Sequence, residues 1–238
     1  MKYKILGLIT ARAGSKGITN KNKRNLAGKP LIVWTMEAAK ESNAFSDIVL
    51  STDDEDIVQI AKDNDVKVPF IRPKELAMDN SSHIDVIIHA LNWLQKYDNF
   101  KPDIVVLLQP TSPLRNAYDI QESISIAVNK NADAVISLCE CSAHPYLIKK
   151  ISNQGKVESF YKTPNGYLPR QSFPLAYYIN GAIFLAHTDI LLEKKTWYTS
   201  KTYPYIMPEE RSLDINTPRD LYLAELILKN QYKNGNNF

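Results

Sequence analysis

The 238-residue chain has few of the features that mark exported, membrane-spanning or disulfide-bonded proteins. No run approaches the roughly 18 apolar residues of a membrane span. Lys2 and Lys4 lead directly into a strand-like run without a small-residue cleavage site, so no signal peptide is expected. The two cysteines, Cys139 and Cys141, have a C-x-C spacing that does not favour a disulfide. We therefore expect a protein of the reducing cytoplasm with no membrane partner.

The sequence also lacks the patterns of a zinc site and of a nucleic-acid-binding surface. Its four histidines do not form an H-E-x-x-H pattern, and no paired C-x-x-C motif is present. The 29 Lys and Arg residues nearly balance the 26 Asp and Glu residues, and a net charge of +3 is too small to indicate a nucleic-acid partner. Hydrophobic residues make up 44% of the chain, which suits a sizeable core and excludes a disordered protein.

Short apolar runs alternate with amphipathic stretches of helical length, as in the βαβ units of a parallel sheet. Strands are predicted at residues 5–10, 48–51, 67–71, 104–109, 134–138 and 182–186. Helices are predicted at residues 31–42, 55–64, 82–97, 118–129 and 218–230. We therefore predict a single α/β domain over residues 1–238, built on a doubly wound, mostly parallel sheet.

The alternation breaks between residues 139 and 178. Prolines and glycines there separate short polar and aromatic pieces, which is typical of an insertion rather than another βαβ unit. Residues 148–151 and 157–160 flank an Asn-Gln-Gly sequence, which predicts a β-hairpin. A projecting hairpin suits a subunit contact or a lid over a site, and we expect it to be the contact of a homodimer.

The most informative stretch is residues 12–24, directly after the first predicted strand. It carries five cations, two glycines and no carboxylate. Ligands of open parallel sheets bind beyond the carboxyl ends of the strands, where Arg12, Lys16 and Lys21 would offset the roughly four negative charges of a nucleoside triphosphate. Neither a G-x-x-x-x-G-K-[ST] loop nor a G-x-G-x-x-G loop is present. The plainer interpretation of this stretch is a solvated basic loop with turn glycines.

Further short motifs follow this basic loop along nearly the whole chain. In order they are ARAGSKG at 11–17 with Lys21 and Asn22, STD at 51–53, RPKELAMD at 72–79, LQPTSPLR at 108–115, HP at 144–145, PRQ at 169–171, NGAI at 180–183 and DINT at 214–217. Together they closely resemble the signature of the acylneuraminate cytidylyltransferases, which activate sialic acid and related nonulosonic acids. One glycine-rich loop would be weak support, but so many motifs in one order are highly specific.

The resemblance implies a CTP-dependent nucleotidyltransferase with Mg²⁺ as cofactor. In the implied reaction the anomeric hydroxyl of a nine-carbon sugar acid attacks the α-phosphorus of CTP, pyrophosphate leaves and a CMP-sugar forms. The implied nucleotide-binding residues are Arg12, Gly14, Ser15, Lys16, Asn22, Arg72 and Ser81. The implied catalytic residues are Arg12, Lys21 and Asp214.

The resemblance also implies a sugar-acid site and a metal site. Gln109, Arg170 and Asn180 match sugar-acid-binding positions, and Arg170 either contacts the C1 carboxylate or supports the pocket indirectly. Asp214 and Asn216 match the positions that hold Mg²⁺, a hard cation that prefers oxygen ligands.

The chain departs from the family pattern at three positions. Asn216 replaces the second aspartate of a D-I-D-T motif, which removes one negative charge from the metal site. Tyr178 stands where relatives that act on sialic acid often have arginine, and His83 stands where a small hydroxyl residue is common. These changes favour a sugar acid other than ordinary N-acetylneuraminic acid, for example a legionaminic-type acid.

Three alternatives remain open from the sequence. One is a 3-deoxy-manno-octulosonate cytidylyltransferase, which normally has a different opening loop. Another is a nucleotide-binding homologue without catalytic activity, and the last is a nucleic-acid-binding module, which the mild net charge disfavours. No side chain is identified as the base for the attacking hydroxyl, and the four histidines are interpreted as structural.

Overall fold

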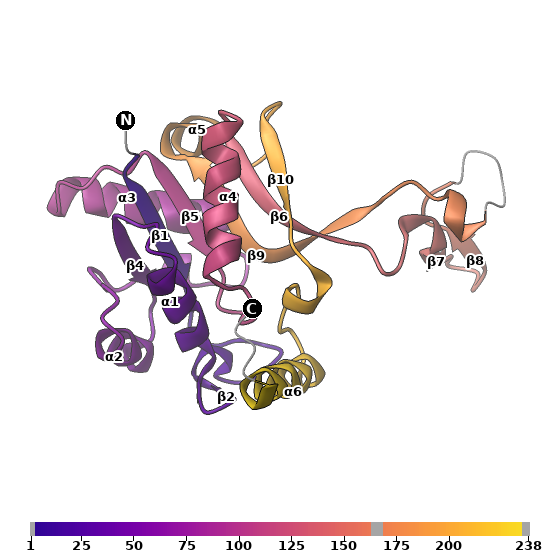
Figure 1. Cartoon of the computed structure of the whole chain (residues 1–238), viewed down its shortest axis with the longest axis horizontal. Coiled ribbons are helices and arrows are strands. Elements are labelled where there is room, and N and C mark those ends of the chain that lie inside the picture. The colour runs from indigo at the N-terminus through magenta and orange to yellow at the C-terminus, as the bar shows by residue number, and fades with distance from the viewer. Residues whose placement is uncertain (1–2, 163–168, 235–238) are drawn as a thin grey trace.

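Five of the six predicted apolar runs are strands of one six-stranded sheet in a computed structural model that describes residues 3–162 and 169–234 (Figure 1). Across the sheet the order is β10 (Thr202–Ile206), β6 (Ala134–Glu140), β9 (Tyr177–His187), β5 (Ile104–Leu108), β1 (Ile5–Thr10) and β4 (Asp47–Ser51). β1 is parallel to both of its neighbours, and β10 is parallel to β6. The predicted α/β class with a mostly parallel sheet is confirmed.

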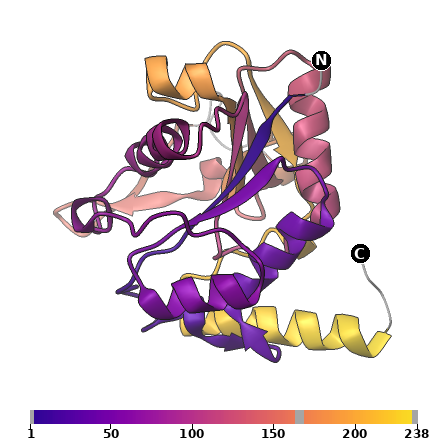
Figure 2. The ribbon, with the colours of Figure 1, turned by 90° about the vertical axis from the view of Figure 1, so that its left-hand side faces the viewer.

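Alternation along the strands sends side chains to two separate cores, one on each face of the sheet. From β1, Ile5 and Ile9 join a cluster with α1 (Leu31–Glu41), α2 (Glu55–Asp63) and α4 (Ala117–Asn129). Leu6 and Leu8 join the opposite cluster, with α3 (His83–Tyr97) and α5 (Thr188–Lys194). Figure 2 shows these helical layers on either side of the strands. This double covering explains why the central strands are continuous apolar runs.

One predicted strand is wrong, and one strand of the six-stranded sheet was missed. Residues 67–71 make only isolated bridges to Val49 and Thr52, because Pro69 has no N–H to donate to a continuous ladder. β10 was missed because Pro204 interrupts its pattern, although an edge strand tolerates proline. β9 runs antiparallel to β5 and β6, a direction that apolar content alone does not reveal.

A long arm leaves the sheet between β6 and β9 and is prominent in Figure 1. We define the arm as residues 141–176, of which residues 163–168 lie outside the described part of the chain. At its end β7 (Lys149–Ile151) pairs antiparallel with β8 (Val157–Ser159), so the predicted hairpin is confirmed. Both strands of this hairpin are exposed along their whole length.

The last helix, α6 (Pro218–Asn234), packs on a third cluster near the carboxyl edge of the sheet. Thr217 caps its start, since Asp220 N donates to Thr217 Oγ1 at 3.3 Å and Asp220 Oδ2 accepts from Thr217 N at 2.7 Å. The cluster joins Ile215 to Ile18 of the basic loop and to the short β2 (Asn25–Leu26), which pairs with β3 (Lys29–Pro30). Among the described residues, no helix has the length and apolarity needed to cross a membrane.

Candidate active site

A pocket of about 350 Å³ opens at the carboxyl ends of the central strands, where the basic loop meets the segment before α6. Most of the predicted site residues line it: Arg12, Ser15, Lys16, Lys21, Asn22, Arg72, Ser81, Gln109, Asp214 and Asn216. The lining does not include Gly14, Arg170 or Asn180. Residues from distant parts of the chain therefore meet where a doubly wound sheet places its ligand.

Two contacts fix the backbone of the basic loop. Near its start, Ala13 N donates to Asp53 Oδ1 at 2.9 Å. Farther along, Gly17 passes so close to Asn216 that a β-carbon at Gly17 would lie 2.3 Å from the Asn216 carbonyl oxygen. Asp53 directly precedes the cap of α2, which Asp54 provides by accepting from Asp56 N and Ile57 N. Asp53 instead holds the loop.

Lys21 is bound beside the predicted metal-binding carboxylate. Its Nζ donates to Ile215 O at 2.8 Å. Burial lowers the pKa of Lys21, and the nearby Asp214 carboxylate opposes that shift. The ammonium is thereby directed to the same corner of the pocket as Asp214, where negative charge of a bound polyphosphate would gather.

Asp214 presents a carboxylate oxygen that suits a cation. Its Oδ2 accepts from Asn216 Nδ2 at 2.7 Å, whereas its Oδ1 is buried without a hydrogen-bond partner. The described residues hold no cluster of three or more His, Cys, Asp or Glu side chains that could form an all-protein metal site. Mg²⁺ usually binds through one or two carboxylates together with substrate phosphates, so Asp214 with the amide of Asn216 fits such a group.

Arg72 is a buried cation in the pocket lining, held next to the end of β4. It is 5% exposed, and its Nε donates to Ser51 Oγ at 3.0 Å. Burial lowers its pKa to about 10, so the guanidinium stays charged at neutral pH. Ser81 also lines the pocket, where its hydroxyl accepts from Met78 N at 3.0 Å and donates to Glu75 O at 3.1 Å. Arg72 is thus rigidly placed, as a residue that reads a base must be.

Asp79 pairs with two of the predicted triphosphate-binding cations. Its Oδ1 lies 2.6 Å from Arg12 Nη2, and its Oδ2 forms an ion pair with Lys16 Nζ. Lys16 and Arg12 hold the pKa of the Asp79 carboxyl below its ordinary value. The carboxylate therefore occupies the cations that an incoming triphosphate would need. Sequence reasoning did not assign Asp79 a role, because its pairing with residues far away in the chain appears only in the fold.

Replacing Asp79 with Asn should tighten the binding of CTP. The triphosphate then no longer competes with a carboxylate for Arg12 and Lys16. The affinity for CTP should rise only about fivefold, because the ion pairs that are lost are partly exposed to water and therefore weak. Isothermal titration with CTP at low salt measures this dissociation constant. Asp47→Asn is the matched control, since it removes the same charge from an ion pair with Lys67 outside the pocket. Unchanged or weaker CTP binding by Asp79→Asn would show that the carboxylate does not compete.

The predicted sugar-acid residues separate into three environments. Gln109 lines the pocket directly after β5 and lies against Gly181, whose φ of 77° places it in the left-handed region. Asn180 is 2% exposed, and its side chain is engaged by Ser137 and Ser212. Arg170 is exposed on the arm, outside the pocket of its own chain.

His83 is a pocket residue that sequence reasoning interpreted as structural. It lies at the start of α3 and lines the pocket together with Arg72 and Ser81. The signal in the sequence was its replacement of the small hydroxyl residue that is common at this position. The imidazole ring therefore takes up more space than a small hydroxyl side chain would, beside the residues that the resemblance implies for nucleotide binding.

Curated proteins with known names are similar to most of this chain in sequence. The chain is 38% identical to the N-acylneuraminate cytidylyltransferase of Streptococcus agalactiae serotype III over 90% of this chain and 50% of that protein, so it spans about half the length of this relative. It is 36% identical to the CMP-N,N'-diacetyllegionaminic acid synthase of Legionella pneumophila over 95% of this chain and 97% of that protein.

The fold is also found in a solved structure. A CMP:2-keto-3-deoxy-manno-octonic acid synthetase complexed with CTP superposes with a TM-score of 0.72 over 96% of this chain and 99% of that one. Their sequence identity of 17% limits this likeness to the fold. The sequence profile described as cytidylyltransferase matches residues 6–236. The chain therefore belongs to the cytidylyltransferase family.

Proposed function

We propose that the protein transfers CMP from CTP to the anomeric hydroxyl of a nonulosonic acid and releases pyrophosphate. The observation that carries this proposal is the meeting of Arg12, Lys16 and Lys21 with Asp214 in one pocket at the carboxyl edge of the sheet. The names of the relatives from Streptococcus and Legionella support the same reaction.

In the proposed reaction the sugar hydroxyl oxygen forms a bond to the α-phosphorus, and the bond from that phosphorus to the β-phosphate oxygen breaks. Negative charge accumulates on the leaving pyrophosphate, where Arg12, Lys16 and Lys21 stabilise it electrostatically. The proton of the attacking hydroxyl is released in the same step. The hydrogen bond from Ala13 N to Asp53 and the contact of Gly17 with Asn216 hold the backbone of the loop in place. Arg12 and Lys16 exchange Asp79 for the triphosphate when it binds.

Mg²⁺ is the cofactor of this proposal, with Asp214 and Asn216 as its protein ligands. When bound, it neutralises phosphate charge and orients the triphosphate. The free, buried Oδ1 of Asp214 supports this assignment. Lys21 next to Asp214 limits the repulsion between this carboxylate and the phosphates.

The proposed acceptor is a nonulosonic acid of the legionaminic type. Tyr178 departs from the pattern of relatives that act on sialic acid, and the likeness to the Legionella synthase covers nearly the whole of both chains. His83, another departure, lies beside Arg72 and therefore does not bear on this assignment. The 3-deoxy-manno-octulosonate alternative has only the distant structural likeness in its favour.

Pyrophosphate release with CTP, Mg²⁺ and single sugar acids tests this choice. We expect the largest kcat/KM with N,N'-diacetyllegionaminic acid, lower values with N-acetylneuraminic acid and none with 3-deoxy-manno-octulosonate. A clear preference for N-acetylneuraminic acid would contradict the acceptor assignment but leave the reaction class intact. CTP binding without release for any acid would instead favour a catalytically inactive homologue.

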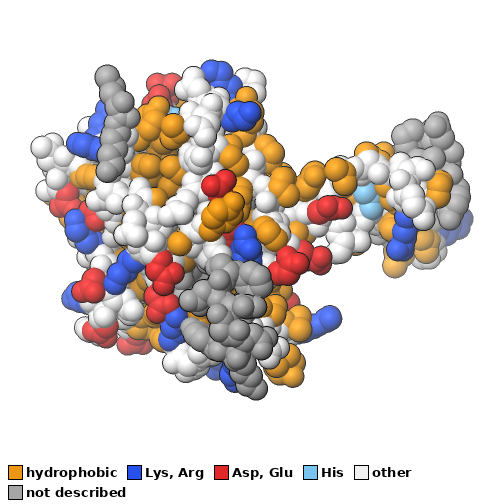
Figure 3. Space-filling view, in the orientation of Figure 1, with side chains coloured by type: hydrophobic (Ala, Val, Ile, Leu, Met, Phe, Trp, Pro, Cys, Tyr) orange, Lys and Arg blue, Asp and Glu red, His pale blue; other side chains and the backbone are white. Residues whose placement is uncertain are grey.

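We also propose that two copies of the chain associate through the arm. Large apolar side chains are exposed there, among them Ile151 at 76%, Val157 at 73% and Leu175 at 72%, and Figure 3 shows apolar atoms on this projection. Exposed apolar surface of this kind marks interaction sites. Arg170 lies on the same arm, so its contact with a sugar-acid carboxylate would have to be made in the pocket of the second copy.

The double variant Ile151→Lys with Val157→Lys should therefore be monomeric. These residues are partners in the hairpin register, and their new charges would be buried in the contact. Size-exclusion chromatography with light scattering measures the mass, and Val128→Lys on α4 is a control at an exposed apolar position outside the arm. A monomeric parent chain at micromolar concentration, or a dimeric double variant, would refute the arm contact.

A further inference from the structure

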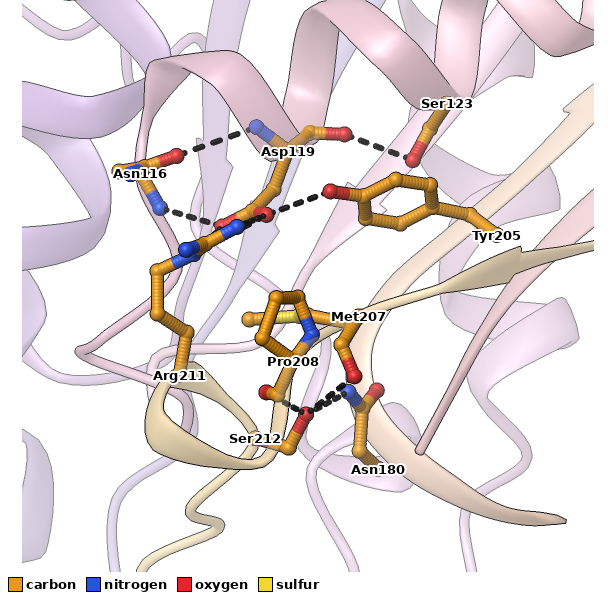
Figure 4. A network of polar contacts seen from close by, with 9 residues as sticks. All are labelled: Asn116, Asp119, Ser123, Asn180, Tyr205, Met207, Pro208, Arg211 and Ser212. Atoms are coloured by element: carbon orange, nitrogen blue, oxygen red, sulfur yellow. Dashed lines mark hydrogen bonds and ion pairs between the residues drawn. The ribbon is translucent and has the colours of Figure 1, made fainter. Parts of the chain in front are cut away.

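Arg211 lies outside the pocket but only three residues before Asp214 in the chain. It ends the short 3₁₀ turn Glu209–Arg211 that follows β10. Its guanidinium forms a bidentate ion pair with the Asp119 carboxylate on the first turn of α4, with Nη2 2.7 Å from Oδ1 and Nε 3.0 Å from Oδ2 (Figure 4). A bidentate pair fixes the orientation of the guanidinium as well as its distance from the carboxylate.

Asp119 is itself immobilised. It is fully buried, and its Oδ1 also accepts from the Tyr205 hydroxyl at 2.6 Å. Its Oδ2 accepts from Asn116 N at 3.0 Å, while Asp119 N donates to Asn116 Oδ1, which completes a capping box at the start of α4. Arg211 is thus tied at once to a helix terminus and to the edge strand β10.

The segment that follows Arg211 is held in place by further hydrogen bonds. Ser212 Oγ accepts from Asn180 Nδ2 at 2.9 Å and donates to Pro208 O at 2.7 Å (Figure 4). Ile215 N donates to Thr111 O at 2.8 Å. Asp214 therefore lies between two fixed points of the backbone, and Arg211 supplies the charged anchor on one side.

We propose that Arg211, held by Asp119, is a positioning residue for Asp214. This inference rests on the function proposed above, in which Asp214 binds the metal. The ion pair adds no net charge to the pocket, and neither partner lines it. Its effect is to fix the backbone from which Asp214 projects, whereas the side-chain partner of the carboxylate itself is Asn216. Groups behind the ligands tune metal affinity in this way in other metal sites.

An ordinary structural ion pair would affect stability alone, so the test measures metal affinity directly. Arg211→Lys keeps the charge but loses the two-pronged geometry. The control is Ile120→Val, a fully buried position next to Asp119 on α4, which lowers stability without touching the ion pair. Binding of Mn²⁺ to the full chain with saturating CTP is followed by electron paramagnetic resonance, after subtraction of a CTP-only titration.

We expect Arg211→Lys to weaken Mn²⁺ binding about tenfold, with CTP affinity in the absence of metal changed less than twofold. Ile120→Val should match the parent chain in both measurements. Parent-like Mn²⁺ affinity in a folded Arg211→Lys would overturn the proposal. If that variant does not fold, Tyr205→Phe replaces it; a weakening of about threefold supports the proposal, and unchanged affinity overturns it. Failure of the parent chain to bind Mn²⁺ with CTP would instead contradict the proposed function itself.

Discussion

Asp214→Asn should lower kcat for pyrophosphate release by about a thousandfold while leaving the dissociation constant of CTP without metal nearly unchanged. The substitution keeps the volume of the side chain and removes its negative charge. Oδ1 is the buried, unpartnered oxygen and Asn216 is already neutral, so the DINT motif has no second carboxylate for the proposed metal-binding role. The loss should therefore fall on the transfer step rather than on recognition of the nucleotide.

Asp103→Asn is the matched control for this prediction. Asp103 directly precedes β5 at the edge of the sheet opposite the pocket, and its carboxylate accepts from Lys4 N at 2.7 Å. Its replacement should reduce stability by about 1 kcal/mol through the weakened hydrogen bond and leave kcat within twofold to threefold of the parent value. Equal losses in the two variants would mean that Asp214 acts by holding the fold and not by binding the metal.

Gly17→Ala should reduce kcat/KM about a hundredfold, as a 1 Å displacement of catalytic groups does. The added methyl group would lie 2.3 Å from the Asn216 carbonyl oxygen, which is backbone and has little freedom to yield. Normal contact distances of about 3.5 Å require the loop and the 214–217 segment to separate by about 1 Å. That separation moves Lys16 and Lys21 relative to Asp214.

Gly155→Ala separates this steric effect from the general cost of replacing glycine. Gly155 has a φ of 74° in the hairpin of the arm, and its added methyl group would meet open space. The Gly155→Ala variant should lose about 1–2 kcal/mol of unfolding free energy, because alanine is strained in the left-handed region, and it should keep its activity. Steady-state rates and thermal unfolding measure both variants. Full activity in Gly17→Ala would show that the close contact between the basic loop and the 214–217 segment is not needed for catalysis.

Elements with strong local signals could be predicted from the sequence. β1 has the predicted bounds because a continuous apolar run separates Lys4 from the basic loop. α2 was predicted within one residue, because Asp54 at its start is a clear capping signal. The 67–71 segment was misassigned because its β-branched residues outweighed Pro69 in the pattern.

The long-range pairings could not be predicted in the same way. Asp119 and Arg211 lie 92 positions apart, and nothing local to either residue indicates the other. The same holds for Asp79 with Arg12 and for Asp53 with Ala13. Most residues that the resemblance implied for the site line one pocket, but the resemblance did not reveal that Asn180 is buried among hydroxyls or that Arg170 lies outside the pocket of its own chain.

The most direct test of the account is ³¹P nuclear magnetic resonance of the purified chain with CTP, Mg²⁺ and N,N'-diacetyllegionaminic acid. The proposed reaction predicts that the three CTP resonances are replaced by pyrophosphate and one new phosphodiester resonance in equal molar amounts, and that Asp214→Asn gives neither. Pyrophosphate accompanied by free CMP would show hydrolysis rather than transfer. An unchanged CTP spectrum with every sugar acid, from a chain that binds CTP, would contradict the proposed reaction.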